Sequence, residues 1–580
     1  MSSHGATRSS GSPDVPADHM TGGDPLDPLQ RVVAWRRHIF PLLILLLLLF
    51  FVVYPAARVI IESLAVEGNI GLAHYRDLVL NPYIFRKVWS SVLVAAGSAC
   101  TSTLLGLVLA ITVMKTALPL RRLFAVAAIT PMILPGFVTA LAYVFLVGRN
   151  GLLTYRLFHI SWEVYSWRSV LILQSIGFTT TTFLLISAAL AGVDSRVEDA
   201  ARNLGAGEWS ILSTVTLPLV RPAIIGALLL VFLRSMADFG TPLIVGGRFD
   251  TLASASYNQL IGNYDMSMAS AMNVVLLVIC LGIFPLYNTL QGSGKVLATE
   301  GGGERKCLSL PVWANKALLG VSSAFAVAIF ALVASVFLAA FTRHIGSNFT
   351  LTLDHFRILP QQGWNSIRNT LLFAGATCVL MSLAGIVIAY IVHRPSFFGR
   401  RLVDLLATLP FAIPGTFMGI GFAIAFSQAP LVLSGTWSII IICTVVRELP
   451  LGVRVGISVL AQMDHSLEDA SANLGASRIL TFFRIVVPQA RYALLISALY
   501  AFVASVKTLG AIIFLITPFN KVLAVDVFEA TLRGEVGDAS ALSIVMILVA
   551  VSGILAIYCI HRKEVAASWV KKVLRNHLPV

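Results

Sequence analysis

Long apolar runs recur along the chain from residue 39 to residue 561, and each approaches the ~20 residues that a helix needs to cross a bilayer. Within hydrocarbon every backbone polar group must be paired inside its own segment, so runs of this length can only be helices. Charged residues make up 12% of the chain, against about 25% in an average soluble protein, which leaves too few to coat soluble domains. The pattern excludes a soluble enzyme and a nucleic-acid-binding protein. It predicts an all-α integral membrane protein with the lipid bilayer as its surroundings.

The runs predict about twelve transmembrane helices in two sets of six. The first begins near residue 39, and we interpret it as an uncleaved span because the leader before it is too long for a signal peptide. The other eleven are expected at residues 88–114, 123–147, 169–192, 222–246, 268–290, 317–341, 369–392, 402–427, 436–460, 492–516 and 540–561.

The segments outside the spans give the expected domain organisation and orientation. Lys and Arg total 42 against 28 Asp and Glu, and they concentrate in the loops on the side of the N-terminus. Because cytoplasmic loops are enriched in Lys and Arg, we expect both termini in the cytoplasm. The predicted regions are a disordered cytoplasmic tail at 1–35, a first half at 36–291, a cytoplasmic linker at 292–314, a second half at 315–562 and a basic cytoplasmic tail at 563–580.

Two blocks of sequence occur twice in the same order. Glu198-Asp-Ala-Ala-Arg-Asn-Leu-Gly-Ala206 returns 270 residues later as Glu468-Asp-Ala-Ser-Ala-Asn-Leu-Gly-Ala476. Upstream, the Pro-x-x-x-Pro-Gly block that starts at Pro131 returns at Pro410. These repeats indicate a duplicated unit. With an even number of spans in each unit the halves are parallel, and a pathway is expected between them.

The later repeat lies in the loop between the fourth and fifth spans of each half, and it predicts two short helices. Asp194 and Ser195 precede Glu198, and Ser466 precedes Asp469 by three residues, which is the spacing of a capping box. A glycine should end this first helix, an amphipathic segment follows, and a proline should start the next span. The glycines are Gly205 and Gly475, and the prolines are Pro218 and Pro488. We call residues 194–218 and 464–488 the first and second elbows.

The elbows resemble the EAA motif of the inner-membrane permeases of ABC importers. In that family the motif reads Glu-Ala-Ala, three residues, Gly, nine residues and Ile-x-Leu-Pro. The first copy matches at Ala200, Ala201, Gly205, Leu217 and Pro218, with Asp199 in place of Glu and Val215 in place of Ile. The second copy has Asp469 for Glu, Ser471 for the second Ala and Val487 for Leu. The resemblance extends over about residues 35–565.

The resemblance implies a type I ABC importer permease fold in a bacterial inner membrane, with two identical cytoplasmic ATPase subunits as partners. Each elbow would sit in a groove of one ATPase, as an amphipathic helix does in helix-in-groove recognition. A periplasmic or lipid-anchored binding protein would deliver the cargo. The expected coupling residues are Glu198, Asp199, Ala200, Ala201, Gly205, Pro218, Glu468, Asp469, Ala470, Ser471, Gly475 and Pro488.

ATP and magnesium are expected on the partner ATPase, and no cofactor on this chain. The nearest likeness to a phosphate-binding loop, Gly292-Ser-Gly-Lys-Val296, lacks the first glycine, the Ser or Thr after the lysine and a preceding strand. The six cysteines include no C-x-x-C pair, so neither a disulfide framework nor a metal site is predicted. The chain is therefore expected to be a permease subunit and not an enzyme.

Charged residues inside the spans require a reason because they are unfavourable in hydrocarbon. They either line the pathway or, as Arg234–Asp238 and Arg447–Glu448 pairs, join helices to one another. For Lys507, which has no acid within a helical turn, we favour the pathway. The candidates are Arg234, Asp238, Arg447, Glu448, Arg454 and Lys507. The prolines Pro131, Pro135, Pro410 and Pro414 lie inside the third and ninth spans, where they should kink the helices, with a role in gating.

The expected cargo is ferric iron, because Ser235–Gly240 and Gly246–Leu252 look like the ferric branch of the family. The excess of cations within the spans favours an anionic cargo such as a phosphonate or a sugar phosphate, which is the alternative. An ion-coupled secondary transporter is an alternative of another class. It would need proton- or sodium-binding acids at mid-membrane, where only Asp238 and Glu448 qualify, and it would have no repeated elbow.

Overall fold

The computed structural model describes residues 39–66, 68–148, 151–160, 162–292, 307–344, 348–393, 399–464 and 466–577. Helices dominate this part of the chain, and its strands form two small antiparallel hairpins. The hairpins are β1 (Ala65–Val66) with β2 (Asn69–Ile70), and β3 (Thr342–His344) with β4 (Asn348–Leu351). The predicted all-α membrane class is confirmed. The expected tail at 1–35 and most of the expected linker lie outside the described residues.

Nine helices in the described ranges are long and apolar enough to cross a membrane. They are Ile39–Ser63, α4 (Pro82–Lys115), Gly136–Tyr155, α7 (Trp167–Ala191), Glu208–Met236, α13 (Met266–Gly292), α14 (Val312–Phe341), α15 (Trp364–His393) and α24 (Val536–His577). Two bent pairs add α16 (Arg400–Thr408) with α17 (Gly415–Ala425), and the segment Arg478–Gln489 with α22 (Arg491–Lys507). The remaining predicted span, the tenth, is α18 (Trp437–Leu460), which is long enough but carries three charged residues.

The third and ninth spans are broken in the same way. The third consists of α5 (Arg121–Ile129), a 3₁₀ turn η2 (Thr130–Met132) and α6 (Gly136–Val147). The ninth consists of α16, a 3₁₀ turn η7 (Leu409–Phe411) and α17, and its two parts meet at 111°. Each break coincides with the repeated prolines, which lack a backbone donor and clash with the preceding helical turn.

The expected ends of the fifth and eleventh spans, at 246 and 516, are wrong. Helix α10 (Leu217–Met236) and helix α22 both stop about ten residues earlier, at positions that are equivalent in the repeat. The chain continues through a short helix, α11 (Gly240–Val245), in the first half and through turns in the second. These segments are buried in protein, where irregular backbone is tolerated, so their apolar composition does not mark the helix end.

Two further helices occupy equivalent places and were not predicted. They are α12 (Leu252–Asn263) and α23 (Leu523–Leu532). The backbone N–H of Leu252 donates to Ser91 Oγ at 2.7 Å, and that of Leu523 donates to Thr370 Oγ1 at 2.9 Å. Each bond fixes the first turn of the helix to the second span of its own half. The internal symmetry thus extends beyond the blocks that are alike in sequence.

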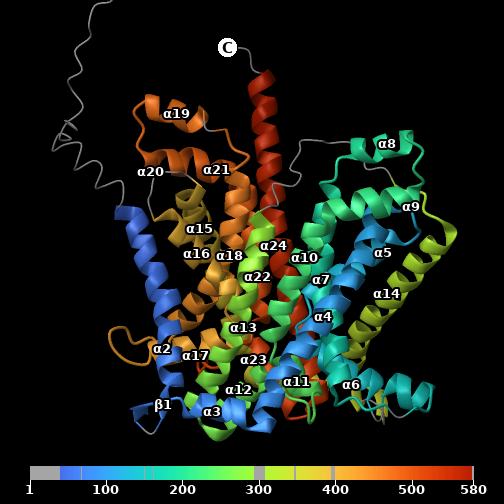
Figure 1. Cartoon of the computed structure of the whole chain (residues 1–580), viewed down its shortest axis with the longest axis vertical. Helices are drawn as coiled ribbons and strands as arrows, with labels where there is room; N and C mark the ends of the chain where they lie inside the picture. The colour runs from blue at the N-terminus through green and yellow to red at the C-terminus, as the bar shows by residue number, and fades with distance from the viewer. Residues whose placement is uncertain are drawn as a thin grey trace, which may run out of the picture.

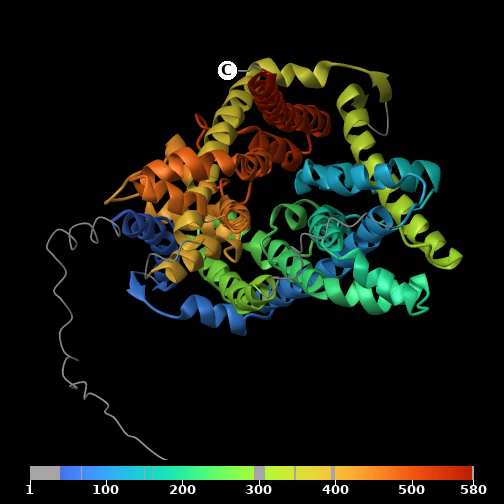
Figure 2. The same cartoon turned by 90° about the horizontal axis from the view of Figure 1, so that it is seen from above.

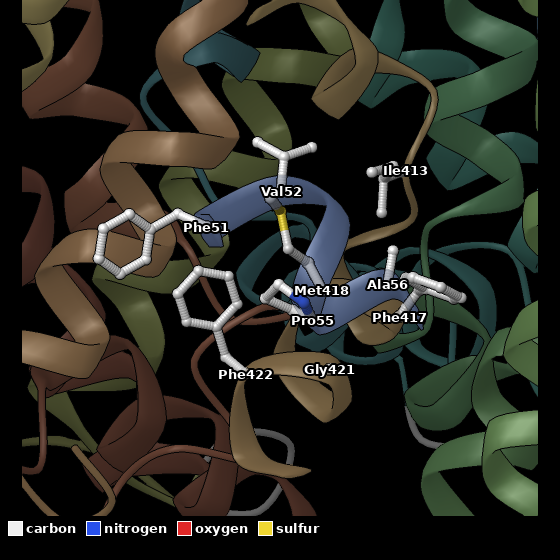
Figure 3. A pocket seen from close by; sticks show the side chains of 9 residues that line it. All are labelled: Phe51, Val52, Pro55, Ala56, Ile413, Phe417, Met418, Gly421 and Phe422. Atoms are coloured by element: carbon white, nitrogen blue, oxygen red, sulfur yellow. The ribbon is translucent and has the colours of Figure 1, made fainter. Parts of the chain in front are cut away.

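The first helix of each half packs against the other half. Helix α14 of the second half contacts α6, α4 and α5 of the first, and α2 (Tyr54–Ser63) of the first half contacts α17 of the second. In Figure 2, α14 lies beside the blue and cyan helices of the first half. Figure 3 shows the contact of the first span with α17, an apolar pocket lined by Phe51, Val52, Pro55, Ala56, Ile413, Phe417, Met418, Gly421 and Phe422.

The two elbows lie at the same end of the molecule (Figure 1). Helices α8 (Ser195–Asn203) and α19 (Ser466–Asn473) are both at the end where the C-terminal helix α24 terminates. Helices α12 and α23 lie at the opposite end. The arrangement agrees with the parallel halves that the repeat predicts.

Candidate functional site: two elbows and a charged interface

Each elbow begins with a helix of eight or nine residues that an aspartate caps. The Arg196 backbone N–H donates to Asp194 Oδ1 at 2.9 Å, and the Ser466 N–H donates to Asp464 Oδ1 at 2.9 Å. The expected capping boxes at Ser195–Glu198 and Ser466–Asp469 are therefore wrong. Asp194 and Asp464 instead each accept from the backbone N–H two residues later, which satisfies an N–H of the first turn that has no partner within the helix.

Both helices end at the predicted glycines. Gly205 has φ +86° and Gly475 has φ +80°, and the next residue bonds back across the turn to the carbonyl of Ala201 or Ser471 at 3.1 Å. This left-handed conformation is accessible to glycine without a steric penalty and is disfavoured for β-branched residues. A Cβ at either position would meet nothing within 4 Å, so the requirement for glycine is conformational.

The two elbows join their spans differently. In the first, π-helix η4 (Ile211–Thr216) leads into α10, and Pro218 lies in the first turn of that span, as expected. In the second, Pro488 lies in the three-residue helix α21 (Val487–Gln489), before a bend of 71° into α22. The expectation that Pro488 starts the next span is therefore wrong by a few residues.

Glu198 anchors the first elbow to the body of the protein. It is 2% exposed, and its Oε1 lies 2.5 Å from Lys115 Nζ at the end of α4. The same oxygen accepts a bond of 2.7 Å from Thr216 Oγ1. A buried carboxylate with a cation and a hydroxyl as partners is fixed in place. Glu198, which precedes the motif aspartate, therefore supports the elbow from inside the protein.

The next acid, Asp199, belongs to a surface cluster. Arg202 Nη1 lies 2.5 Å from Asp199 Oδ1, and Arg202 Nε lies 2.7 Å from Glu208 Oε1. The hydrogen bond to Glu208 and the charges of both acids raise the pKa of Arg202 above its usual value. The cluster links the two helices of the elbow across Gly205.

The second elbow also bonds to the body of the protein and within itself. Tyr390 OH donates to Glu468 Oε2 at 3.1 Å. Ser471 Oγ and Thr481 Oγ1 share a hydrogen bond of 2.8 Å. In the first elbow the positions of that pair are occupied by Ala201 and Ile211, which belong to one apolar cluster. The departure of Ser471 from the motif is thus matched by a change at its neighbour.

The surface of both elbows displays the same apolar side chains. Leu204 and Leu474, directly before the helix-ending glycines, are each 89% exposed. Val197 and Leu467, one turn into each first helix, are each 45% exposed. Exposed leucines at matched positions form a typical binding surface. These four residues were not identified from the sequence. The leucine directly before the glycine in both copies of a polar loop could have indicated an exposed apolar position.

Two charged side chains, Arg234 and Lys507, each donate a hydrogen bond to a residue of the opposite half. Arg234 Nη2 on α10 donates to Tyr500 OH on α22 at 3.1 Å. Lys507 Nζ at the end of α22 donates to the Met132 carbonyl in the break of the third span at 2.8 Å. Arg234 Nη1 also bonds Thr181 Oγ1 within its own half, at 3.0 Å. Tyr500 is a member of this site that sequence reasoning missed, because an apolar run gives no signal for one tyrosine.

The structure does not bring Arg234 and Asp238 together, although both are described. Asp238 lies beyond the end of α10, where its Oδ2 accepts from Gln174 Nε2 at 3.0 Å and its Oδ1 from the Thr241 N–H at 3.3 Å. The interpretation of these residues as a neutralised i,i+4 pair is wrong, because the helix ends between them. Asp238 instead starts helix α11.

The charges of α18 separate into two places. Arg447 Nε lies 3.7 Å from Glu448 Oε1, which is an ion pair but too long for a hydrogen bond. Arg454 Nη1 lies 3.5 Å from Asp404 Oδ1 of α16, and its side chain is 42% exposed. Arg454 is thus joined to a neighbouring helix. Among the described residues, no group of three or more His, Cys, Asp or Glu side chains could hold a metal ion.

The four prolines have two distinct positions in the breaks. Pro131 and Pro410 lie in the 3₁₀ turns, and Pro135 and Pro414 are extended residues directly before α6 and α17. The second proline of each pair starts a helix, and the first ends one. The breaks face the charged interface, since Lys507 bonds one of them and Arg447 lies against Gly415 at the other.

Comparison with known proteins identifies the family. The family of binding-protein-dependent transport system inner membrane components matches twice, at residues 102–292 and 381–563. A ferric transport system permease protein, FbpB of Actinobacillus pleuropneumoniae, is 33% identical over 87% of this chain and 75% of its own length. A putative ferric transport system permease protein of Haemophilus influenzae is 33% identical over 83% of this chain and 78% of its own length.

A more distant relative is named for the transport of a different substrate. The putative 2-aminoethylphosphonate transport system permease protein PhnU of Salmonella typhimurium is 27% identical over 43% of this chain and 89% of its own length. The two family matches lie one in each half of the chain, and each includes an elbow, a broken span and the helix that follows the elbow. The chain belongs to the inner-membrane permease components of binding-protein-dependent transport systems, with two permease halves in one polypeptide.

Proposed function

We propose that this permease imports ferric iron, delivered by a periplasmic or lipid-anchored binding protein and driven by two copies of a cytoplasmic ABC ATPase. The support for the cargo is that two ferric permease proteins are 33% identical to this chain over more than four fifths of its length. The support for ATP coupling is the pair of elbows with equal exposed leucines at one end of the molecule. A repeated docking surface fits a dimeric motor and has no use in an ion-coupled transporter.

The elbows define the cytoplasmic face in this proposal. Lys and Arg concentrate in the loops at that end, which favours the same side for both termini. The binding protein then docks at the opposite end, near α12 and α23.

Force from the motor passes through the elbow anchors. Closure of the ATPase dimer around ATP draws the two elbows together. Because Lys115 and Thr216 hold Glu198, displacement of the first elbow moves α4 and α10 with it. Tyr390 on α15 has the same role for Glu468. The halves rock against each other, and the broken spans beside the charged interface are the segments whose angle changes.

The test is uptake by the complete complex in proteoliposomes. Complexes of permease, ATPase and binding protein are supplied with radiolabelled ferric iron or with a labelled organophosphonate, with ATP or a non-hydrolysable analogue inside. ATP-dependent accumulation of iron is the expected result. Iron at background together with ATP-dependent accumulation of the organophosphonate would overturn the iron assignment. It would favour the second candidate, an anionic organophosphorus cargo, which the cationic interface and the phosphonate-permease relative support.

A further inference from the structure

The interface between the halves contains a group of cations with too few acids to neutralise them. Arg234 comes from the first half, and Lys507 and Arg447 come from the second. The Lys507 ammonium interacts electrostatically with Arg234, Arg447 and Glu448, so these four side chains form one cluster. Asp238 is bound to Gln174 elsewhere, and Arg454 is paired with Asp404. Three cations therefore face one carboxylate.

Arg447 is the least satisfied member of this cluster. Its Nη1 atom is buried and has no hydrogen-bond partner among the described residues. Its ion pair with Glu448, at 3.7 Å, uses Nε. A guanidinium is always charged and presents five N–H donors in a planar fork that matches the oxygens of carboxylate and phosphate groups. An unused donor of this kind, beside two other cations, is suited to an oxyanion.

The surrounding backbone packs closely against this guanidinium and adds to the positive potential. A Cβ at Gly415 would lie 2.6 Å from Arg447 Nη1, so the guanidinium approaches the backbone there more closely than any side chain would allow. Gly415 is the first residue of α17, and α6 starts directly after the break whose Met132 carbonyl binds Lys507. The N-terminal ends of such half-helices carry partial positive charge, and they face anionic groups in other transporters with broken spans.

A bare trivalent cation cannot pass this cluster easily. Like charges a few ångströms apart in a poorly solvated site repel one another by several kcal/mol. No group of three or more acidic, histidine or cysteine side chains is available among the described residues to compensate. Ferric iron is a hard ion that prefers oxygen ligands, and an oxyanion supplies both those ligands and the opposite charge.

We propose that Arg447, Lys507 and Arg234 form an oxyanion-contact site in the pathway, and that ferric iron crosses as a complex with a phosphate-type oxyanion. The inference rests on the proposed function and names the chemical form of its cargo. Arg447 is the residue that binds the oxyanion directly. Lys507 and Arg234, which already donate to Met132 and Tyr500, hold the two halves around it.

The first experiment asks whether the oxyanion accompanies the iron. Proteoliposomes with the complete complex receive binding protein loaded with ⁵⁵Fe and ³³P-labelled phosphate. We expect both labels to accumulate in an ATP-dependent manner and in a constant ratio. Accumulation of ⁵⁵Fe without ³³P, at a rate unaffected by removal of phosphate, would overturn the inference and leave the iron assignment intact. Background ⁵⁵Fe with ATP-dependent uptake of an organophosphonate would instead overturn the iron assignment on which the inference rests.

The second experiment tests the contact residue. Arg447→Gln removes the charge, whereas the matched control Arg447→Lys keeps it. Loss of a charge-assisted hydrogen bond to the oxyanion should lower uptake by about tenfold or more in Arg447→Gln, and by less in the control, which keeps the charge but lacks the planar fork. ATPase copurification and ATP hydrolysis in the presence of binding protein should persist in both, which separates this result from misfolding. Equal iron uptake by Arg447→Gln and the wild type would contradict the proposal.

Discussion

Lys115 and Glu198 form a buried ion pair with 2.5 Å between Nζ and Oε1, and it joins the end of the second span to the first elbow. In the second half the equivalent glutamate, Glu468, accepts a hydrogen bond from the Tyr390 hydroxyl on α15, at 3.1 Å. Each elbow is therefore bonded to the second span of its own half. In the proposed mechanism the elbow and this span therefore move together.

The Lys115–Glu198 pair can be tested by removing one partner at a time. Lys115→Met should destabilise the protein by about 3–5 kcal/mol, because it leaves a buried carboxylate without its cation. The double variant Lys115→Met/Glu198→Leu should recover most of that stability. Thermal unfolding of the purified protein in detergent measures both. Single variants as stable as the wild type would show that the pair is not the anchor.

The glycines at the helix ends are required for their backbone conformation. Gly205→Val with Gly475→Val should abolish ATP-driven uptake while the protein still inserts in the membrane, because valine resists a positive φ. The matched control is Asn at both positions, since asparagine tolerates the left-handed region. Uptake in proteoliposomes and copurification of the ATPase are the measurements. If the valine variant keeps both, the elbows are not the coupling elements.

The exposed leucines should contribute to partner binding and little to folding. Leu204→Asp and Leu474→Asp place a charge where 89% of each side chain is exposed, so the unfolding temperature should not change. We expect ATPase affinity to fall by about tenfold or more for the double variant, as for a truncated anchor residue at an interface. Leu→Met at both positions preserves the apolar surface and is the control. Affinity is measured by titration of ATPase onto the immobilised permease. Equal affinity in the Asp and Met variants would rule out this docking surface.

The orientation can be tested by labelling single cysteines in a cysteine-free background. Asn203→Cys, in the first elbow, should react with an impermeant thiol reagent only from the cytoplasm. Thr350→Cys, in the hairpin strand β4, should react only from outside. Intact cells and inverted vesicles give the two accessibilities. The reverse pattern would invert the topology and place the elbows away from the motor.

The sequence was sufficient for the architecture because a membrane span needs only a long apolar run, and all twelve predicted positions hold helices. It was sufficient for the helix ends at Gly205 and Gly475 because only glycine adopts their conformation readily. It failed at the ends of the fifth and eleventh spans. There the apolar run continues into buried turns around Asp238 and Thr508, and hydropathy reports burial without distinguishing a helix from a turn.

The sequence shows which charged residues lie within the spans, but it does not show which residues they bond. The spacing of Arg234 and Asp238 suggested a pair within one helix, and the helix ends between them. The true partners, Thr181 and Tyr500, are distant in the chain, and Tyr500 meets Arg234 only when the halves assemble. The burial of Glu198 was likewise unforeseeable, because a motif residue in a polar loop reads as surface until Lys115 is placed beside it.

The exchange of first helices between the halves has a consequence for how this protein is made. The face of α6 is covered by α14 of the other half, and the face of α17 is covered by the first span. A half synthesised alone would leave that face exposed to lipid, and its own first helix would have no partner helix to pack against. The nascent chain must therefore keep its first half incomplete until α14 emerges from the ribosome. Because the halves are joined in one polypeptide, α14 is synthesised directly after the first half. Each first half therefore has one α14, and the two are inserted at the same place in the membrane.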